Sequence, residues 1–106
     1  MEVNQITARM SNPEIVMELG RRFKEYRLAH RLTQKEAAQG AGVSLLTLRQ
    51  FENGKVCNIT MGNFLAMLRM VDCLERMDDV LPGLPVSAYV MEQIMHKKAR
   101  RVKHGK

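Results

Sequence analysis

The sequence predicts an all-α fold, on three observations. Apolar residues recur at helical spacing in several segments, polar cap residues precede these segments, and apolar and polar residues never alternate for more than a few positions. The 106 residues are 45% hydrophobic and 26% charged. This composition is typical of one small soluble domain with a single modest core.

The first helix is predicted to follow an N-terminal arm over residues 1–12, which lack periodicity. Asn12 followed by Pro13 and Glu14 is typical of a helix start, because Asn caps free N–H groups and Pro fits the first helical position. One apolar face then recurs at intervals of three and four, which predicts a helix to about Arg31: Ile15, Leu19, Phe23 and Tyr26.

Two short helices are predicted next, joined by a sharp turn. Thr33 and Glu36 fit a capping box that opens the first of them. Gly42 permits the positive φ that a tight turn needs, and Ser44 can cap the second helix, predicted over residues 45–52. Two residues of this second helix lie three apart and are expected to face the core: Leu48 and Phe51.

Three more helices complete the prediction. Thr60 can cap a fourth helix, and Asp72 with Glu75 fits the cap of a short fifth one. The run Pro82-Gly83-Leu84-Pro85 breaks the chain. A last helix is expected from about Ser87 to Arg101, with these residues on its apolar side: Val90, Met91, Ile94 and Met95.

The pair of short helices around a glycine turn is typical of a helix-turn-helix unit, here over residues 34–52. On the segments that match in register, the chain resembles the Xre (Cro/cI-repressor) helix-turn-helix family over about residues 17–81: Leu32-Thr33-Gln34-Lys35-Glu36-Ala37-Ala38, Gly42-Val43-Ser44, Thr47-Leu48 and Phe51-Glu52-Asn53-Gly54-Lys55. The resemblance implies a compact five-helix, lambda-repressor-like DNA-binding domain, for which we predict residues 13–82. Residues 83–106 are predicted to form a C-terminal helix and basic tail.

The second helix of such a unit can enter the major groove with its N-terminal residues toward base edges. This geometry predicts that five residues contact bases: Ser44, Leu45, Leu46, Arg49 and Gln50. Arg49 is suited to guanine and Gln50 to adenine. The leucines are open to two interpretations, contact with thymine methyl groups or packing on the protein or a partner.

The resemblance also implies contacts that set the position of the domain on DNA without reading sequence. Gln34 is expected near the backbone, where it can brace the reading helix, and other residues are expected at phosphates: Thr33, Thr47, Asn53 and Lys55. Arg27 is expected to pair with Glu52 and tie the first helix to the reading helix. The alternative is that Arg27 also approaches a phosphate.

The charge of the chain is unevenly distributed. The net charge is +6, and residues 96–106 hold six of the 17 bases and no acid, whereas residues 71–95 carry five acids and one base. This basic tail is either a second DNA contact or a solvated end. Its candidate contact residues are Lys97, Lys98, Arg100, Arg101 and Lys103.

Several function classes find no support in the sequence. It holds no Gly-rich phosphate loop, GxSxG, HExxH or paired-cysteine zinc motif, so we expect neither an enzyme nor a metal or other cofactor. No run of about 18 uncharged apolar residues occurs, so we expect no membrane span. Two cysteines, Cys57 and Cys73, and an N-terminus without a secretory signal favour a reduced, cytoplasmic chain.

Three functions therefore compete. The first is a bacterial or phage-type transcriptional regulator, a repressor that binds a palindromic operator as a homodimer, with its dimer surface near residues 72–84. The second is an autorepressing antitoxin that also neutralises a Hip-type kinase toxin. It follows from a resemblance, on shorter motifs, to the antitoxin subset of the family, at Val80-Leu81-Pro82 and the basic C-terminal end. The third is a non-specific nucleic-acid-binding module driven by the tail.

Overall fold

The computed structural model describes residues 5–56, 58–85 and 88–104, and over these residues the chain is helical without a strand. The elements are α1 (Asn12–Ala29), α2 (Gln34–Ala41), α3 (Leu45–Glu52), α4 (Met61–Met70), the 3₁₀ helix η1 (Leu74–Arg76), α5 (Met77–Val80) and α6 (Ala88–His104). The predicted all-α class is confirmed. Cys57 and Ser87, the residue at which the last helix is predicted to start, lie outside the described residues.

The first helix begins one residue earlier than predicted. Ser11, not Asn12, is the cap residue: its Oγ accepts from the N–H of Glu14 at 3.3 Å, and the Glu14 carboxylate accepts from the N–H of Ser11 at 2.8 Å. Asn12 is therefore already helical. The helix ends at Ala29 and not near Arg31, because Arg31 adopts a positive φ of 56° that no helix continues.

The helix-turn-helix segment follows its predicted local chemistry. The Thr33 hydroxyl accepts from the N–H of Glu36 at 3.0 Å, and the Glu36 carboxylate accepts from the N–H of Thr33 at 2.9 Å, which confirms the capping box. These bonds hold the pKa of Glu36 below its ordinary value. Gly42 takes a left-handed φ of 71° at the turn, and Ser44 caps α3 through its Oγ, as predicted.

The predicted cap at Asp72 is wrong. Asp72 has a positive φ of 57°, and its carboxylate lies 3.3 Å from the Nε2 atom of His30. Glu75 therefore opens no capping box. The segment that follows is not one regular helix, because it starts as η1 and continues as the single turn α5, and neither has a side-chain cap. Thr60, by contrast, caps α4 as predicted.

The core lies where α1, α2, α3 and α4 meet, and α2 contributes the buried Ala37 and Ala38. Leu48, Phe51 and Met67 have no exposed surface, and the Phe51 ring lies 6.0 Å from that of Phe23 and 6.1 Å from that of Phe64. These aromatic contacts join three helices. The burial of Leu48 and Phe51 confirms that both side chains point inward. Gly20 of α1 allows α3 to approach closely, since a Cβ there would lie 1.9 Å from the carbonyl oxygen of Phe51.

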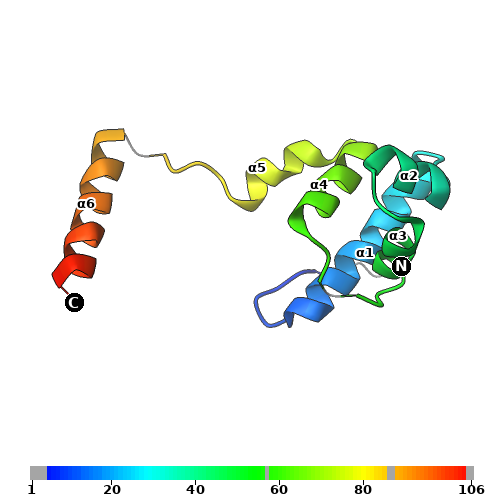
Figure 1. Cartoon of the computed structure of the whole chain (residues 1–106), viewed down its shortest axis with the longest axis horizontal. Coiled ribbons are helices and arrows are strands. Elements are labelled where there is room, and N and C mark those ends of the chain that lie inside the picture. The colour runs from blue at the N-terminus through cyan, green and yellow to red at the C-terminus, as the bar shows by residue number, and fades with distance from the viewer. Residues whose placement is uncertain (1–4, 57, 86–87, 105–106) are drawn as a thin grey trace.

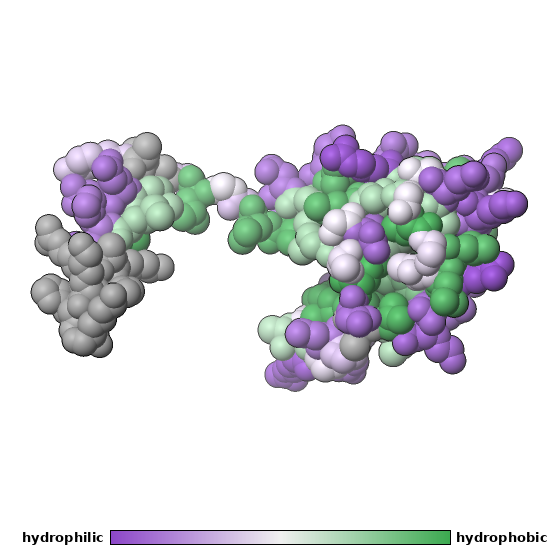
Figure 2. Space-filling view, in the orientation of Figure 1, coloured by the Kyte–Doolittle hydropathy of each residue, from purple (hydrophilic) through white to green (hydrophobic). Residues whose placement is uncertain are grey.

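The last helix stands apart from the rest of the chain. Helices α1 to α5 gather into one body, and the segment Leu81–Pro85 leads away from it to α6 (Figure 1). Apolar surface is exposed at the junction between the body and this segment (Figure 2). Among the described residues, no helix has the length and hydropathy required to cross a bilayer.

Candidate nucleic-acid interface

Helix α3 presents one face to the core and the other to solvent. Leu48, Phe51 and Glu52 are buried on the inner face. At 100° per residue, the opposite face holds one leucine and two polar residues of α3, and the residue that follows the helix continues it. The structure exposes most of this face and leaves only Gln50 half-buried. We call it the reading face, and its members are Leu46, Arg49, Gln50 and Asn53.

The two leucines at the start of α3 differ in burial. Leu45 is partly buried and packs against the core cluster. Leu46 is 64% exposed. The packing interpretation therefore fits Leu45, whereas the side chain of Leu46 remains accessible to solvent.

The hydroxyl groups near the turn serve local structure first. Ser44 Oγ accepts from the N–H of Thr47 at 3.0 Å and donates to the Thr47 hydroxyl at 2.8 Å. The Thr33 hydroxyl is bonded to the first turn of α2. All three groups lie at helix N-termini, where free N–H groups favour an approaching phosphate.

A buried ion pair fastens α3 to α1. Arg27 donates through Nε to Glu52 Oε2 at 2.6 Å and through Nη2 to Glu52 Oε1 at 3.0 Å, and both side chains are almost fully buried. Its Nη1 donates to the carbonyl oxygen of Leu32 at 2.8 Å. Arg27 and Glu52 thus form the pair that the resemblance implied, in the bidentate geometry that fixes two groups most firmly.

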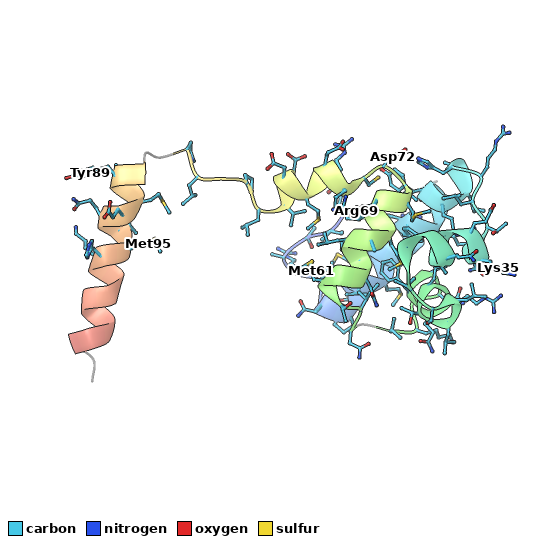
Figure 3. The ribbon with its side chains drawn as sticks, turned by 45° about the horizontal axis from the view of Figure 1, so that its top comes forward. Lys35, Met61, Arg69, Asp72, Tyr89 and Met95 are labelled. Atoms are coloured by element: carbon cyan, nitrogen blue, oxygen red, sulfur yellow. The ribbon has the colours of Figure 1, made fainter. Side chains whose placement is uncertain are left out.

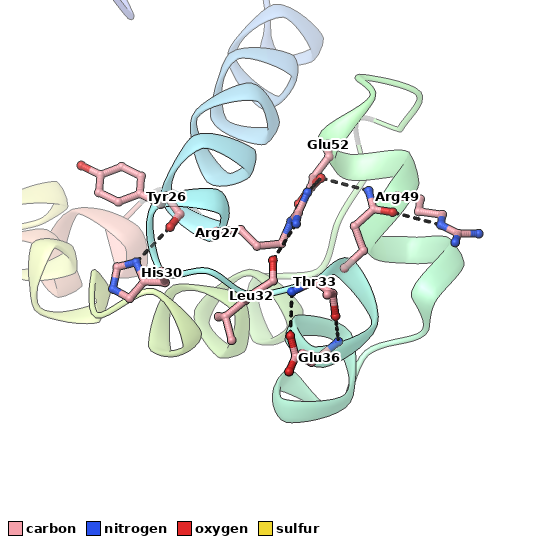
Figure 4. A network of polar contacts seen from close by, with 9 residues as sticks. Tyr26, Arg27, His30, Leu32, Thr33, Glu36, Arg49 and Glu52 are labelled. Carbon is pink, nitrogen blue, oxygen red and sulfur yellow. Dashed lines mark hydrogen bonds and ion pairs between the residues drawn. The ribbon is translucent and has the colours of Figure 1, made fainter.

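Gln34 bonds both Glu52 and Arg49, the latter two of which are labelled in Figure 4, and so extends this pair to the reading face. Its Nε2 donates to Glu52 Oε1 at 3.1 Å, and its Oε1 accepts from Arg49 Nε at 3.2 Å. The terminal nitrogens of Arg49 point away from this network in Figure 4. Arg49 is therefore held at its Nε while its two Nη groups remain directed outward.

A second charged cluster lies on α1 and was not predicted from the sequence. Glu18 is 5% exposed and accepts from Arg21 at 2.7 and 3.0 Å and from Arg22 at 2.7 Å. The bonds from Arg21 and then Arg22 lower the pKa of Glu18 from 4.5 to about 2. The sequence signal for this cluster was the spacing of Arg21 and Arg22, three and four residues after Glu18, because residues at these spacings meet on one helix face.

A helix-turn-helix consists of two short helices, a tight turn between them and a second helix held against the core with one face exposed. Helices α2 and α3 and the turn at Gly42 have this arrangement. A family model described as "Helix-turn-helix domain" matches residues 18–79, more than half of the chain. The chain belongs to the helix-turn-helix domain family. No curated protein matches it in sequence.

Membership indicates a DNA-binding protein that regulates transcription. The match includes every residue that positions α3, from Arg27 to Glu52, and it ends within α5. The tail of this helix-turn-helix protein lies outside the match. Its helix α6 contains Lys97, and the predicted contact residues beyond it lie where only the backbone is described.

Proposed function

We propose that this chain is a homodimeric transcriptional repressor that reads a partly palindromic operator through residues 44–52. The observation that carries the proposal is the reading face: polar and apolar side chains are exposed on α3, whose opposite face packs on the core and is bonded to α1 through Arg27 and Glu52. A major groove is wide enough to admit such a helix.

The chemistry of the reading face suggests which bases it meets. The two outward Nη groups of Arg49 match the paired acceptors of guanine, and the Gln50 amide matches adenine. Leu46 suits a thymine methyl group. Leu45 packs on the core and is therefore not proposed as a base contact.

Phosphate contacts are proposed around this face. Thr33 and Thr47 lie near helix N-termini, while Asn53 and Lys55 are exposed after the end of α3. Ser44, which the sequence predicts as a base contact, caps α3 with its hydroxyl and is proposed at a phosphate instead. Contacts of this kind fix register and orientation. The basic end of α6 would add a further, sequence-independent contact through Arg100, Arg101 and Lys103.

A dimer would place two copies of α3 in successive major grooves, about 10 bp apart between half-site centres. The surface near residues 72–84 supports this assembly because it exposes Val80, Leu81 and Leu84. As a regulator of transcription, the protein would act in the bacterial cytoplasm, at the nucleoid.

The test is fluorescence anisotropy with DNA from upstream of the gene and with shuffled DNA, at several salt concentrations. Specific binding should exceed non-specific binding by about 10³-fold or more. Arg49→Ala and Gln50→Ala should each cost about 1–3 kcal/mol of specific binding. The matched controls Arg69→Ala and Gln93→Ala, which change exposed residues outside α3, should leave it unchanged.

Equal, steeply salt-dependent binding to both DNAs would contradict the proposal. The non-specific nucleic-acid module would then be the better description, since phosphate contacts alone give that behaviour.

We keep a second candidate, an antitoxin that also binds a Hip-type kinase toxin. It draws support from Val80 and Leu81, which are 67% and 85% exposed directly before Pro82, in the segment that resembles the antitoxin subset. Co-purification with a kinase encoded beside the gene tests it. Failure of the two proteins to associate would leave the stand-alone regulator.

A further inference from the structure

An apolar stripe runs along η1 and α5. Leu74, Met77 and Leu81 line a shallow hollow of about 600 Å³, and Glu75 and Asp78 complete its walls. Spacings of three and four residues place the three apolar side chains on one side, with the two acids beside them. We call this surface the η1–α5 hollow.

Helix α6 also carries an apolar stripe. Met91, Ile94 and Met95 share one side of the helix, and Ile94 and Met95 are 44% and 64% exposed. Tyr89 projects from the other side in Figure 3. An amphipathic helix that stands apart from its own core leaves apolar surface in water, which favours docking on another apolar surface.

The two stripes are complementary in charge. The acids Glu75 and Asp78 flank the hollow, with Asp79 beside them, whereas Lys97 follows the apolar stripe of α6 within one turn. Opposite charges beside matching apolar surfaces fix the register of a contact and suppress wrong partners. A helix with this pattern therefore suits the hollow better than an acidic or uncharged one.

The connection between the two surfaces favours exchange between chains. Pro82 and Pro85 restrict the backbone of the segment Leu81–Pro85, which has no helix and carries α6 away from the body (Figure 1). We propose that α6 of one protomer docks with its apolar side in the η1–α5 hollow of a second copy of this chain. Two copies would exchange their last helices reciprocally, a low-cost route to a dimer.

This inference rests on the proposed function, because it supplies the homodimer that a palindromic operator requires. It also assigns two different roles to the basic residues at the end of α6. Lys97 would face the acids of the partner's hollow, and the bases that follow it in the sequence would remain for phosphates.

The experiment is sedimentation velocity on the full chain across a range of concentrations. The parent should form a dimer that dissociates on dilution. Ile94→Glu on α6 and Leu81→Glu at the hollow should each weaken the dimer about tenfold or more, because each buries a carboxylate in an apolar contact. Leu81 is 85% exposed in the protomer, so its substitution leaves the fold of the single chain intact.

Matched controls add the same charge outside the contact. Gln93→Glu lies next to Ile94 on the other side of α6, and Met61→Glu changes an exposed apolar residue of α4 that does not line the hollow. Both should dimerise like the parent. A dimer that survives Ile94→Glu and Leu81→Glu, or a parent that is monomeric at all concentrations, overturns the inference.

Docking within one chain is a separate outcome. A monomeric parent whose melting temperature falls with Ile94→Glu but not with Gln93→Glu, independently of concentration, would show that α6 folds back on its own hollow, and the inference would be wrong. Equally, a monomeric parent that pairs only with a neighbouring kinase would overturn it.

Operator binding by the same variants separates this inference from the proposed function. Monomeric Ile94→Glu and Leu81→Glu chains should bind an operator half-site and lose cooperativity on the full site. If the parent dimerises as described but prefers no DNA sequence, the docking inference stands and the proposed function fails.

Discussion

At the scale of single residues, one carboxylate connects the core to the DNA-facing surface. Glu52 accepts two bonds from Arg27 and one from Gln34, which in turn accepts from Arg49. The outward direction of Arg49 thus depends on a group that is itself inaccessible to solvent. Such a network is stable only while every member is bonded.

Glu52→Ala is expected to lower both stability and DNA affinity. The substitution leaves Arg27 charged and buried, which costs about 3–5 kcal/mol when one partner of a buried pair is removed. Thermal unfolding should show a melting temperature lower by more than about 10 °C. Glu25→Ala, which removes an exposed carboxylate from α1, should change it little, and Arg27→Met with Glu52→Leu should unfold later than Glu52→Ala alone. An unchanged melting temperature in Glu52→Ala would contradict the pair.

Glu18 should make stability depend on acid pH. Its pKa is about 2 in the folded chain against 4.5 ordinarily, so the unfolded chain binds the proton first. This stabilisation is complete above about pH 4.5 and is lost as the pH falls toward about 2. Melting temperatures measured across this window should fall less steeply in Glu18→Gln than in the parent.

The control for this pH effect is Glu92→Gln, which removes one exposed carboxylate from α6. If Glu18→Gln and Glu92→Gln lose stability with acid along the same curve, the bonds from Arg21 and Arg22 do not hold Glu18 charged.

At the scale of elements, the crossing of α1 and α3 depends on a missing side chain. Gly20 lies in the interior of α1, where glycine is intrinsically unfavourable, yet a Cβ there would lie 1.9 Å from the Phe51 carbonyl oxygen. The cost in helix propensity is offset by the close approach of the two helices. The orientation of the reading face therefore depends on this contact.

Gly20→Ala is expected to destabilise the domain although alanine favours helices. The gain in propensity is about 0.5–1 kcal/mol, whereas overpacking a close contact costs about 1–3 kcal/mol. The free energy of unfolding in urea should fall. Gly62→Ala is the matched control in α4, because nothing lies within 4 Å of a Cβ there, and it should be neutral or stabilising. Equal effects of both substitutions would exclude a tight crossing at Gly20.

At the scale of the whole molecule, the protein consists of a compact body and one separate basic helix. The body carries the reading face, which is held in place by the ion pair between Arg27 and Glu52. Residues 96–106 contain six basic residues and no acidic residue. The two parts would contribute different terms to DNA binding, since base contacts give specificity and phosphate contacts give salt dependence.

Neutralising Arg100, Arg101 and Lys103 with glutamine is expected to weaken binding to operator and shuffled DNA by similar factors. The slope of the logarithm of affinity against the logarithm of salt concentration should decrease by up to about 0.9 for each phosphate that the variant no longer neutralises. Titrations at several salt concentrations measure it. The control is Lys24→Gln, which removes one exposed charge from α1. Identical slopes in the triple variant and the parent would remove the tail from the interface.

Features that depend on neighbouring residues could be predicted from the sequence alone. The capping box at Thr33, the left-handed Gly42, the cap at Ser44 and the inward direction of Leu48 and Phe51 all follow from hydrogen bonds or spacings within a few residues. These interactions form between residues within about one helical turn of each other, so the local sequence is sufficient to predict them. The family membership of the chain could be predicted from the same segment.

Features that depend on distant segments required the folded chain. Arg27 and Glu52 are 25 residues apart and Gln34 and Glu52 are 18 apart, so their network requires the helices to be packed first. Packing also distinguishes Leu45 from Leu46, gives Asp72 a bond to His30 in place of a helix cap, and leaves α6 outside the body. These contacts depend on which helix surfaces pack together. The packing of the whole core decides this, and no local sequence pattern does.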